Sequence, residues 1–219
     1  MESLAIIAEF NPFHTGHARL IRQVRQAAGP EAAIVIIMSG AFVQRGEPAF
    51  FDKWHRAAWA IDGGADVVIE LPAVYALSSA AGFAQGGVTL AARLGCQALA
   101  CGVEGGTAAD FLSLARRSEG LTACLKAAKK SSAGQQLTDA LMAAAPDEAR
   151  LLQQPNALLA FEYARAMLKQ EQPLTFLPLP RQGRHGDTGL GAAFASASAL
   201  RQAMRCSGTA AACRPYLIA

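Results

Sequence analysis

The chain has 219 residues, long enough to bury a full hydrophobic core without disulfide staples. Its five cysteines are scattered and include no C-x-x-C pair, which argues against a disulfide framework and predicts a reducing, cytoplasmic setting. The net charge of +3 and the pI near 8.7 permit a nucleic-acid partner, but they exclude the strongly basic class of dedicated nucleic-acid binders.

The sequence shows no membrane or secretory signal. It begins Met-Glu-Ser-Leu and passes directly into a strand pattern, without the basic and long apolar regions of a signal peptide. No apolar run is long enough to span a bilayer. We therefore expect a cytoplasmic protein without a membrane partner.

Strand and helix patterns alternate through the first half of the chain. Continuous apolar runs, typical of buried parallel strands, occur at residues 4–8, 33–38, 67–71 and 98–101. Helical patterns lie between them at residues 20–28, 54–61 and 80–94. Because a strand and a helix recur about every thirty residues, as in βαβ units, residues 1–106 are predicted to form an open parallel α/β sheet.

The pattern changes after residue 106. Residues 107–150 are alanine-rich and lack strand signals, which predicts a helical insertion or subdomain. Residues 151–206 are predicted to contain an amphipathic helix, an edge strand, a mobile Gly-rich loop and a final helix, at 158–168, 174–179, 181–191 and from about 196. Either Ser196 or Ser198 is expected to cap that final helix. Residues 207–219 show no clear element and are predicted to be an irregular tail.

Two histidines follow the first predicted strand, in the stretch AEFNPFHTGH at residues 8–17. In an open parallel sheet, ligands bind beyond the carboxyl ends of the strands, where helix N-termini favour anions. Pro12 fixes the turn, Gly16 would let a ligand approach the backbone, and the i, i+3 spacing of His14 and His17 places both on one face. Such imidazoles can donate hydrogen bonds to phosphate oxygens and support the charge that gathers on an attacked phosphate.

The two histidines have two other interpretations, a surface pair and a zinc site. They could be a surface pair at a helix start, without a function. A zinc site would need a third ligand, yet the only other histidines are His55 and His185 and no cysteine is suitably spaced, so no metal site is predicted. The Walker, GxGxxG and GxSxG signatures are absent. Position and exclusion together favour nucleotide binding.

His-x-Gly-His after a first strand resembles the motif of the HIGH-type nucleotidylyltransferase superfamily. Six blocks resemble, in order, the bacterial tRNA(Met) cytidine acetate ligase family: EFNPFHTGH, MSGAFVQRGEPA, DKWHRAAWAIDGGADVVIELP, CGVEGG, PNALLAFEY and FASASALRQAM. The resemblance extends from residue 3 to about 205. It implies a HUP/Rossmann-like open parallel sheet, with residues 151–206 completing the ATP site.

The resemblance also implies an activity. Members of the family activate acetate with ATP, normally accompanied by Mg²⁺, to acetyl-adenylate, and pass the acetyl group to N4 of the wobble cytidine of elongator tRNA(Met). One alternative is a small-molecule adenylyltransferase of the same superfamily. Another is a nucleotide-binding or tRNA-binding module without full turnover, because the C-terminal region usual in the family would follow Ala219.

The resemblance assigns roles to individual residues. His14 and His17 become the catalytic stabilisers of the α-phosphate. Ser198 and Arg201 resemble a signature that closes on the outer phosphates, although a helix cap and a solvated charge are the plain alternative. The residues implied in ATP binding are Ile7, Ala8, Glu9, Phe10, Asn11, Pro12, Phe13, His14, Thr15, Gly16, His17, Ala18, Arg19, Leu20, Gly102, Asn156 and Arg181.

Three of these residues lie outside the histidine stretch and also make sense by position. Gly102 follows a strand, where a missing side chain would give adenine or ribose close access. Asn156 opens a helix beside Pro155, so its amide could instead cap that helix. Arg181 follows a strand end and can fork onto phosphate oxygens.

Three charged residues are further candidates. Arg45 and Lys53 could bind pyrophosphate or tRNA, or could simply be solvated. Glu70 ends an apolar strand, so its carboxylate should be either paired with an arginine or functional.

The chain departs from the family at Ala157, where an asparagine is usual, and in RQGRHGDTG, which lacks a Gly-Tyr pair. We expect adenylate formation to tolerate these differences better than tRNA recognition does.

Overall fold

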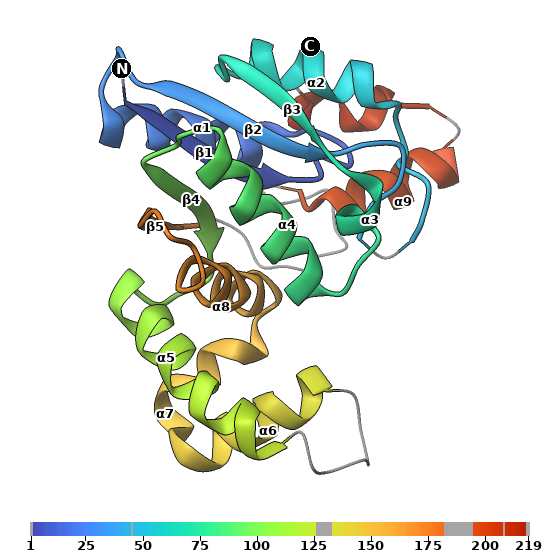
Figure 1. The fold of residues 1–219 in the computed structure, drawn as a ribbon. Coiled ribbons are helices and arrows are strands. Elements are labelled where there is room, and N and C mark those ends of the chain that lie inside the picture. The colour runs from blue at the N-terminus through green and yellow to red at the C-terminus, as the bar shows by residue number, and fades with distance from the viewer. Residues whose placement is uncertain (1, 45, 126–132, 182–194, 208, 218–219) are drawn as a thin grey trace.

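The computed structural model describes residues 2–44, 46–125, 133–181, 195–207 and 209–217. A parallel sheet of five strands in the order β3-β2-β1-β4-β5 organises these residues (Figure 1). The strands are β1 (Ser3–Ala8), β2 (Ala33–Ser39), β3 (Val67–Leu71), β4 (Ala98–Val103) and β5 (Thr175–Pro180). The predicted open parallel α/β sheet is confirmed. Within the described ranges, no helix is both long and apolar enough to cross a bilayer.

Helices cover both faces of the sheet (Figure 1). Leu4 and Ile6 of β1 share one core cluster with Ile21 of α1 (Thr15–Ala28), and α2 (Lys53–Asp62) covers the same face. Ala5 and Ile7 point the other way, into a second core cluster that includes Phe83. This second face is covered by α4 (Ala80–Arg93) and α8 (Pro155–Met167). The continuous apolar run of β1 is explained because successive side chains enter two different cores.

The strand order reverses direction at β1. The chain moves from β1 through β2 to β3 on one side, and then returns to place β4 and β5 on the other. The loop that follows β1 and the loop that follows β4 therefore diverge from each other at the carboxyl ends of these two strands. In open α/β sheets such a switch point is where ligands bind.

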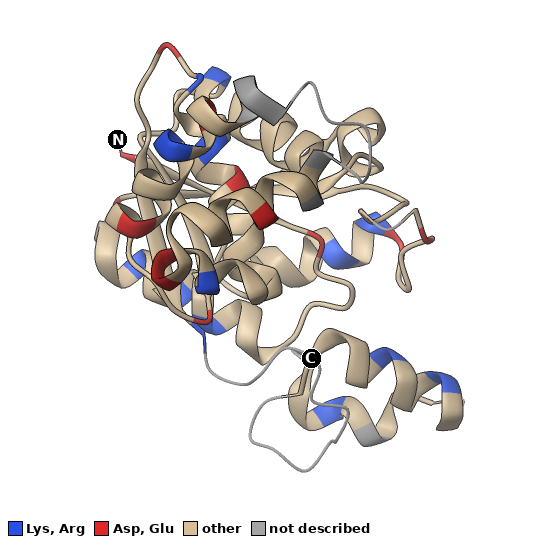
Figure 2. Ribbon diagram, turned by 90° about the horizontal axis from the view of Figure 1, so that it is seen from below, with Lys and Arg blue, Asp and Glu red and all other residues tan. Residues whose placement is uncertain are grey.

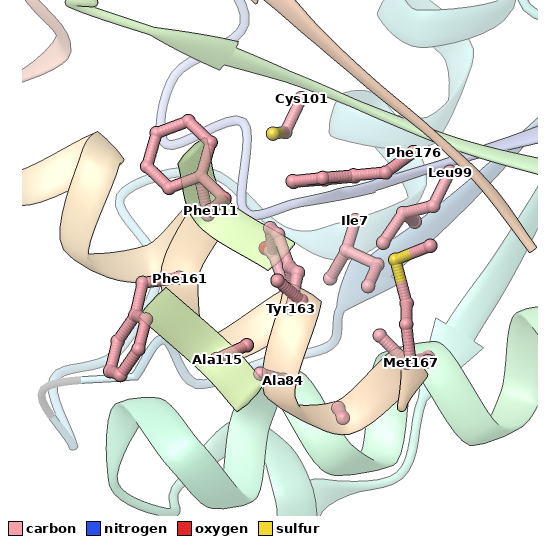
Figure 3. Close-up of a cluster of buried hydrophobic side chains, with 14 of the residues drawn as sticks. Ile7, Ala84, Leu99, Cys101, Phe111, Ala115, Phe161, Tyr163, Met167 and Phe176 are labelled. Atoms are coloured by element: carbon pink, nitrogen blue, oxygen red, sulfur yellow. The ribbon is translucent and has the colours of Figure 1, made fainter. Parts of the chain in front are cut away.

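The described part of region 107–150 consists almost entirely of helices and contains no strand. It contains α5 (Ala108–Leu125), α6 (Ala133–Ala144) and α7 (Pro146–Ala149), and the 3-10 helix η1 (Arg150–Gln153) follows. In Figure 1 these helices lie beyond α8, away from the sheet. Phe111 and Leu114 of α5 join the same hydrophobic cluster as Ile7 and Phe83, which Figure 3 shows in part. The helical region is thus continuous with the core of the sheet.

Two predicted elements have different surroundings from those expected. We expected α8 to be amphipathic, but it is buried on all sides because α4, α5 and the sheet surround it, and its buried Glu162 pairs with Arg165 at 2.8 Å. β3 was expected to be a buried strand, but it forms one edge of the sheet and Val67 is 41% exposed. The prediction that β5 is an edge strand is confirmed.

The end of the chain is more ordered than predicted. Helix α9 (Ala197–Ser207) is capped by Ser196, whose Oγ accepts a hydrogen bond from the backbone N–H of Ala199 at 3.1 Å. A 3-10 helix, η2 (Ala211–Tyr216), replaces the expected irregular tail because Cys213 packs in a small core with Leu200 of α9.

Two other segments differ from the prediction or lie beyond it. The four-residue helix α3 (Ala73–Ala76) was not predicted. The predicted Gly-rich loop was placed at residues 181–191, and all of it after Arg181 lies outside the described residues.

Candidate active site

A cavity of about 840 Å³ opens at the carboxyl ends of β1 and β4, the predicted ligand position. Its volume is in the upper part of the range for small-molecule sites. The predicted site residues that line it are Ile7, Ala8, Glu9, Phe10, Asn11, His14, Gly16, His17, Arg19, Leu20, Gly102, Asn156, Arg181, Ser198 and Arg201. Four others, Pro12, Phe13, Thr15 and Ala18, do not line it, and Phe13 and Ala18 are buried in the core instead.

The loop between β1 and α1 is held in place by hydrogen bonds to the loop between β2 and α2. Glu9 Oε1 accepts from the backbone N–H of Gln44, and Asn11 Oδ1 accepts from that of Phe50, both at 2.7 Å. Phe10 lies between them with a φ of 48°, a left-handed conformation that aromatic residues rarely adopt. Glu9 and Asn11 therefore position the loop that carries the histidines.

Arg56 is a buried anchor of this loop that we did not predict. Its side chain is 0% exposed and donates hydrogen bonds only to backbone carbonyls, those of Glu9 at 2.6 Å, Phe51 at 3.0 Å, Ser39 at 3.1 Å and Gly40. The guanidinium thus joins the ends of β1 and β2 to α2. One sequence signal could have revealed it: Arg56 lies one helical turn before the buried Ala60, on the apolar face of its helix.

His14 and His17 form a reciprocal cap at the start of α1. Nδ1 of His14 accepts a hydrogen bond from the backbone N–H of Gly16 at 3.1 Å, and Nδ1 of His17 accepts from that of His14 at 3.3 Å. The two rings stack with their centroids 3.7 Å apart. Phe10 supports the pair, since its ring lies 4.8 Å from that of His17.

Both histidines are uncharged. Burial lowers the pKa of His14 to about 4, and the positive charge of Arg181 acts in the same direction. Burial, then His14 and Arg181, lower the pKa of His17 well below its usual value. Because each Nδ1 accepts a backbone hydrogen bond, the single proton of each neutral ring must be on Nε2. The pair therefore offers two Nε2–H donors in a cavity without adding charge to it.

Gly16 and Gly102 make room for side chains of the protein itself. A Cβ on Gly16 would lie 2.9 Å from Cε1 of His14, and a Cβ on Gly102 would lie 2.8 Å from Cγ of Arg181. We expected a ligand to use both spaces, but the His14 ring and the Arg181 stem already fill them. The two glycines therefore act on the site indirectly, by setting the positions of these two side chains.

Glu104 organises one side of the cavity and was also missed by sequence reasoning. Its Oε1 accepts a hydrogen bond from Asn156 Nδ2, and its Oε2 accepts from the backbone N–H of Ala157 at 3.1 Å. Glu104, rather than Asn156, thus caps α8. Burial lowers the pKa of Arg181, and the negative charge of Glu104 partly offsets this effect. A carboxylate just after the predicted strand, in CGVEGG, was the available signal.

Ser198 and Arg201 both line the cavity and contact each other. Arg201 Nη2 donates to Ser198 Oγ at 3.3 Å, and its Nη1 donates to the backbone carbonyl of Asn11. α9 and η2 carry three arginines and no acidic residue in their described parts (Figure 2). Of these arginines, Arg201 and Arg205 of α9 line the cavity and add positive charge to it.

Two of the remaining charged candidates, Lys53 and Glu70, do not line the cavity. Lys53 Nζ lies 2.6 Å from Glu70 Oε2, so Glu70 is paired, as expected, but with a lysine rather than an arginine. Both side chains border a small cleft beside Trp54, near the ends of β2 and β3. Arg45 lies outside the described residues. Among the residues that are described, no group of three or more His, Cys, Asp or Glu side chains could hold a metal ion.

Comparisons with known proteins agree with this geometry. The chain matches the family model described as HIGH Nucleotidyl Transferase over residues 1–217. It is 40% identical over 205 residues to a tRNA(Met) cytidine acetate ligase of Pediococcus pentosaceus, with 93% of this chain and 53% of that protein covered. A protein of the same name from Syntrophomonas wolfei is 41% identical over 217 residues, with 93% and 51% covered.

A solved structure shares the fold. The crystal structure of Thermotoga maritima TmcAL bound with alpha-thio ATP superposes with a TM-score of 0.85 at 32% identity, covering all of this chain and 53% of that one. The chain thus spans about half the length of the relatives it matches. The family match over almost every residue, and the paired histidines at the switch point of the sheet, show that the chain belongs to the HIGH nucleotidyl transferase family.

Proposed function

We propose that this chain carries the acetate-activating site of an ATP-dependent tRNA(Met) cytidine acetate ligase. The observation that carries the proposal is the neutral pair of His14 and His17, fixed with its Nε2–H donors at the N-terminus of α1. In the proposal, residues 1–106 bind the nucleotide and residues 151–206 complete the site. Residues 107–150 form a helical subdomain.

The first half-reaction is a displacement at phosphorus. An acetate oxygen attacks the α-phosphorus of ATP, the bond from that phosphorus to the β-bridging oxygen breaks, and pyrophosphate leaves. No proton moves between the protein and the reactants in this step, so the protein has to stabilise charge. The two Nε2–H groups donate to oxygens of the α-phosphate, where negative charge increases. A neutral imidazole suits this task because its Nε2–H is not lost at neutral pH and remains a hydrogen-bond donor.

The positively charged side chains of the cavity hold the rest of the triphosphate. The guanidinium groups of Arg181 and Arg201 can each donate paired hydrogen bonds to phosphate oxygens, and Ser198 adds a hydroxyl beside Arg201. ATP normally brings Mg²⁺, which takes most of its ligands from phosphates and water. The absence of a carboxylate cluster among the described residues fits a metal that arrives with its substrate. The Thermotoga maritima relative bound with alpha-thio ATP supports ATP as the nucleotide.

The second half-reaction transfers the acetyl group. N4 of the wobble cytidine attacks the carbonyl carbon of acetyl-adenylate, AMP leaves, and the amine loses a proton. The names of the relatives support tRNA(Met) as the acceptor. In this proposal the acceptor is the elongator tRNA, and the compartment is the cytoplasm. The arginine-bearing α9 and η2, which lack acidic residues, provide a positive rim that a polyanion can approach.

An ATP–pyrophosphate exchange assay with and without acetate tests the proposal. We expect exchange that depends on acetate, and its near abolition in His14→Ala with the fold intact by circular dichroism. The control is His55→Ala, because His55 is exposed on α2 and does not line the cavity. Exchange that ignores acetate would support a small-molecule adenylyltransferase instead. No exchange under any condition would leave a binding module, and wild-type exchange in His14→Ala would remove the assigned role.

A further inference from the structure

Tyr163 has a buried hydroxyl without a partner. The residue is 2% exposed, and its hydroxyl makes no hydrogen bond to any described residue. Buried polar groups are nearly always hydrogen-bonded, so each exception in a folded protein needs an explanation. Tyr163 also lines the cavity of the active site. A ligand atom in the cavity is therefore the natural partner of this hydroxyl.

The cavity has two chemically different walls. The wall from α1 and α9 is polar and cationic, and contributes Arg19, Gln23, Ser198, Arg201 and Arg205. A second group of lining residues, from α4, β4 and α8, includes Ala80, Phe83, Cys101 and Leu159, with Tyr163 as its buried hydroxyl. Figure 3 shows Tyr163 in the core near Ile7, Cys101 and Phe111. A ligand group on this second wall must be mostly apolar and must accept one hydrogen bond.

The groups around Tyr163 keep it a hydrogen-bond donor. Burial raises the pKa of Tyr163 well above its usual value, and Cys101 and Glu9 act in the same direction. The Cys101 thiol is also neutral, because burial and Glu104 raise its pKa to about 12. The Glu9 carboxylate is already engaged by the backbone N–H of Gln44. Arg181 supplies positive charge at the same edge of the sheet, where it is felt by both histidines.

We infer that Tyr163 and the apolar wall of Ala80, Phe83, Cys101 and Leu159 form the subsite for acetate. The hydroxyl donates to the carboxylate oxygen that does not attack, and the methyl group lies against the wall. Of the reactants in the proposed chemistry, only acetate consists of a small apolar group bonded to a carboxylate. The triphosphate suits the arginine wall instead. The inference rests on the proposed function and names the residue that selects its carboxylate.

Tyr163→Phe tests the subsite, since it removes the hydroxyl and keeps the ring. In the exchange assay we expect KM for acetate to rise roughly 10- to 100-fold, as for the loss of a hydrogen bond to a charged group. KM for ATP should not change, and the melting temperature should stay the same or rise because an unpaired hydroxyl is removed. The matched control is Tyr75→Phe, on α3, which is 39% exposed and does not line the cavity.

Three results would overturn the subsite. They are an unchanged KM for acetate, a parallel rise in KM for ATP, which would assign the hydroxyl to the nucleotide, or a lower melting temperature, which would show a structural role. A second measurement does not depend on turnover. Fluoroacetate, followed by ¹⁹F line broadening with a non-hydrolysable ATP analogue, should bind to the wild type and not to Tyr163→Phe. If the wild type binds fluoroacetate but shows no exchange, the proposed function fails and the subsite stands.

Discussion

Arg201 donates a hydrogen bond from Nη1 to the backbone carbonyl of Asn11, a residue 190 positions earlier in the chain. This bond fastens α9 to the loop that carries the histidine pair. Asn11 in turn accepts a hydrogen bond from Phe50 with its side chain, so three distant segments meet at one residue. The geometry of the histidines therefore depends on a contact that sequence spacing cannot show.

Substitution of Arg201 should weaken catalysis more than stability. Arg201→Lys keeps the charge but cannot bond Asn11 and Ser198 with one planar group. We expect kcat/KM for ATP in the exchange assay to fall roughly 10- to 100-fold, as for a lost charge-assisted hydrogen bond. Arg214→Lys in η2 is the control, because this exposed residue does not line the cavity. Equal effects of the two substitutions would contradict the assigned role of Arg201.

Gly16→Ala should displace the ring of His14. The added Cβ would lie 2.9 Å from that ring, so the imidazole must move from its position over the helix start. We expect exchange activity to fall at least about 10-fold, because misplaced catalytic groups cost orders of magnitude in rate. Gly120→Ala in α5 is the matched control, since nothing lies within 4 Å of its new Cβ.

The control substitution has its own expected result. Gly120→Ala should stabilise the protein by about 0.5 to 1 kcal/mol and leave exchange unchanged, because alanine loses less backbone entropy in a helix than glycine does. Urea unfolding measures the first quantity and the exchange assay the second. Normal activity in Gly16→Ala would show that the ring tolerates the shift.

Stability should fall as the solution becomes acidic. The pKa of His14 is about 4 in the folded protein and 6.5 in the unfolded chain, so the unfolded chain binds the proton more readily. The free energy of unfolding is therefore unaffected by His14 above pH 6.5 and decreases between pH 6.5 and 4, by up to about 3 kcal/mol. The lowered pKa of His17 adds to the same trend.

Urea unfolding between about pH 7.5 and pH 4.5 measures this dependence. His14→Asn is the informative variant, because its Oδ1 can still accept the hydrogen bond from Gly16 while the side chain does not titrate. We expect a shallower dependence on pH in this variant. The same slope in both proteins would show that His14 is not responsible.

Glu104 and Asn156 should behave as a coupled pair. Glu104→Ala removes the cap of α8 and should destabilise the protein by about 1 to 2 kcal/mol. Asn156→Ala should cost less, and the double variant should cost less than the sum of the two, since both remove the same hydrogen bond. Glu119→Ala, an exposed position on α5, is the control in these unfolding measurements. Strict additivity would argue against the contact.

The sheet and its edge position for the site could be predicted because local patterns carry them. The apolar runs that became β1 to β4 are continuous and evenly spaced, and the histidine motif follows the first run directly. The edge strand β5 was marked by its prolines. Each of these signals lies within a few residues of the feature it predicts.

What could not be predicted depends on contacts between distant segments. Arg56 is buried because carbonyls from the loop after β1, from the end of β2 and from the loop after β2 converge on it. Glu104 caps a helix that begins 51 residues later at Pro155. The positions of the His14 ring and the Arg181 stem beside Gly16 and Gly102 could not be predicted for the same reason, because spacing along the chain does not show which side chain lies next to a glycine. η2 was missed because its order comes from the burial of Cys213 against α9 rather than from a helical repeat.

The reciprocal histidine cap has a further consequence for the first turn of α1. The backbone N–H groups of His14 and Gly16 donate the two hydrogen bonds that the Nδ1 atoms accept. If this turn frays, each ring regains a choice of two tautomers, and three of the four combinations present at least one Nε2 lone pair where a phosphate oxygen needs a donor. Amide exchange at these two positions would therefore report directly on how often the site is ready to react.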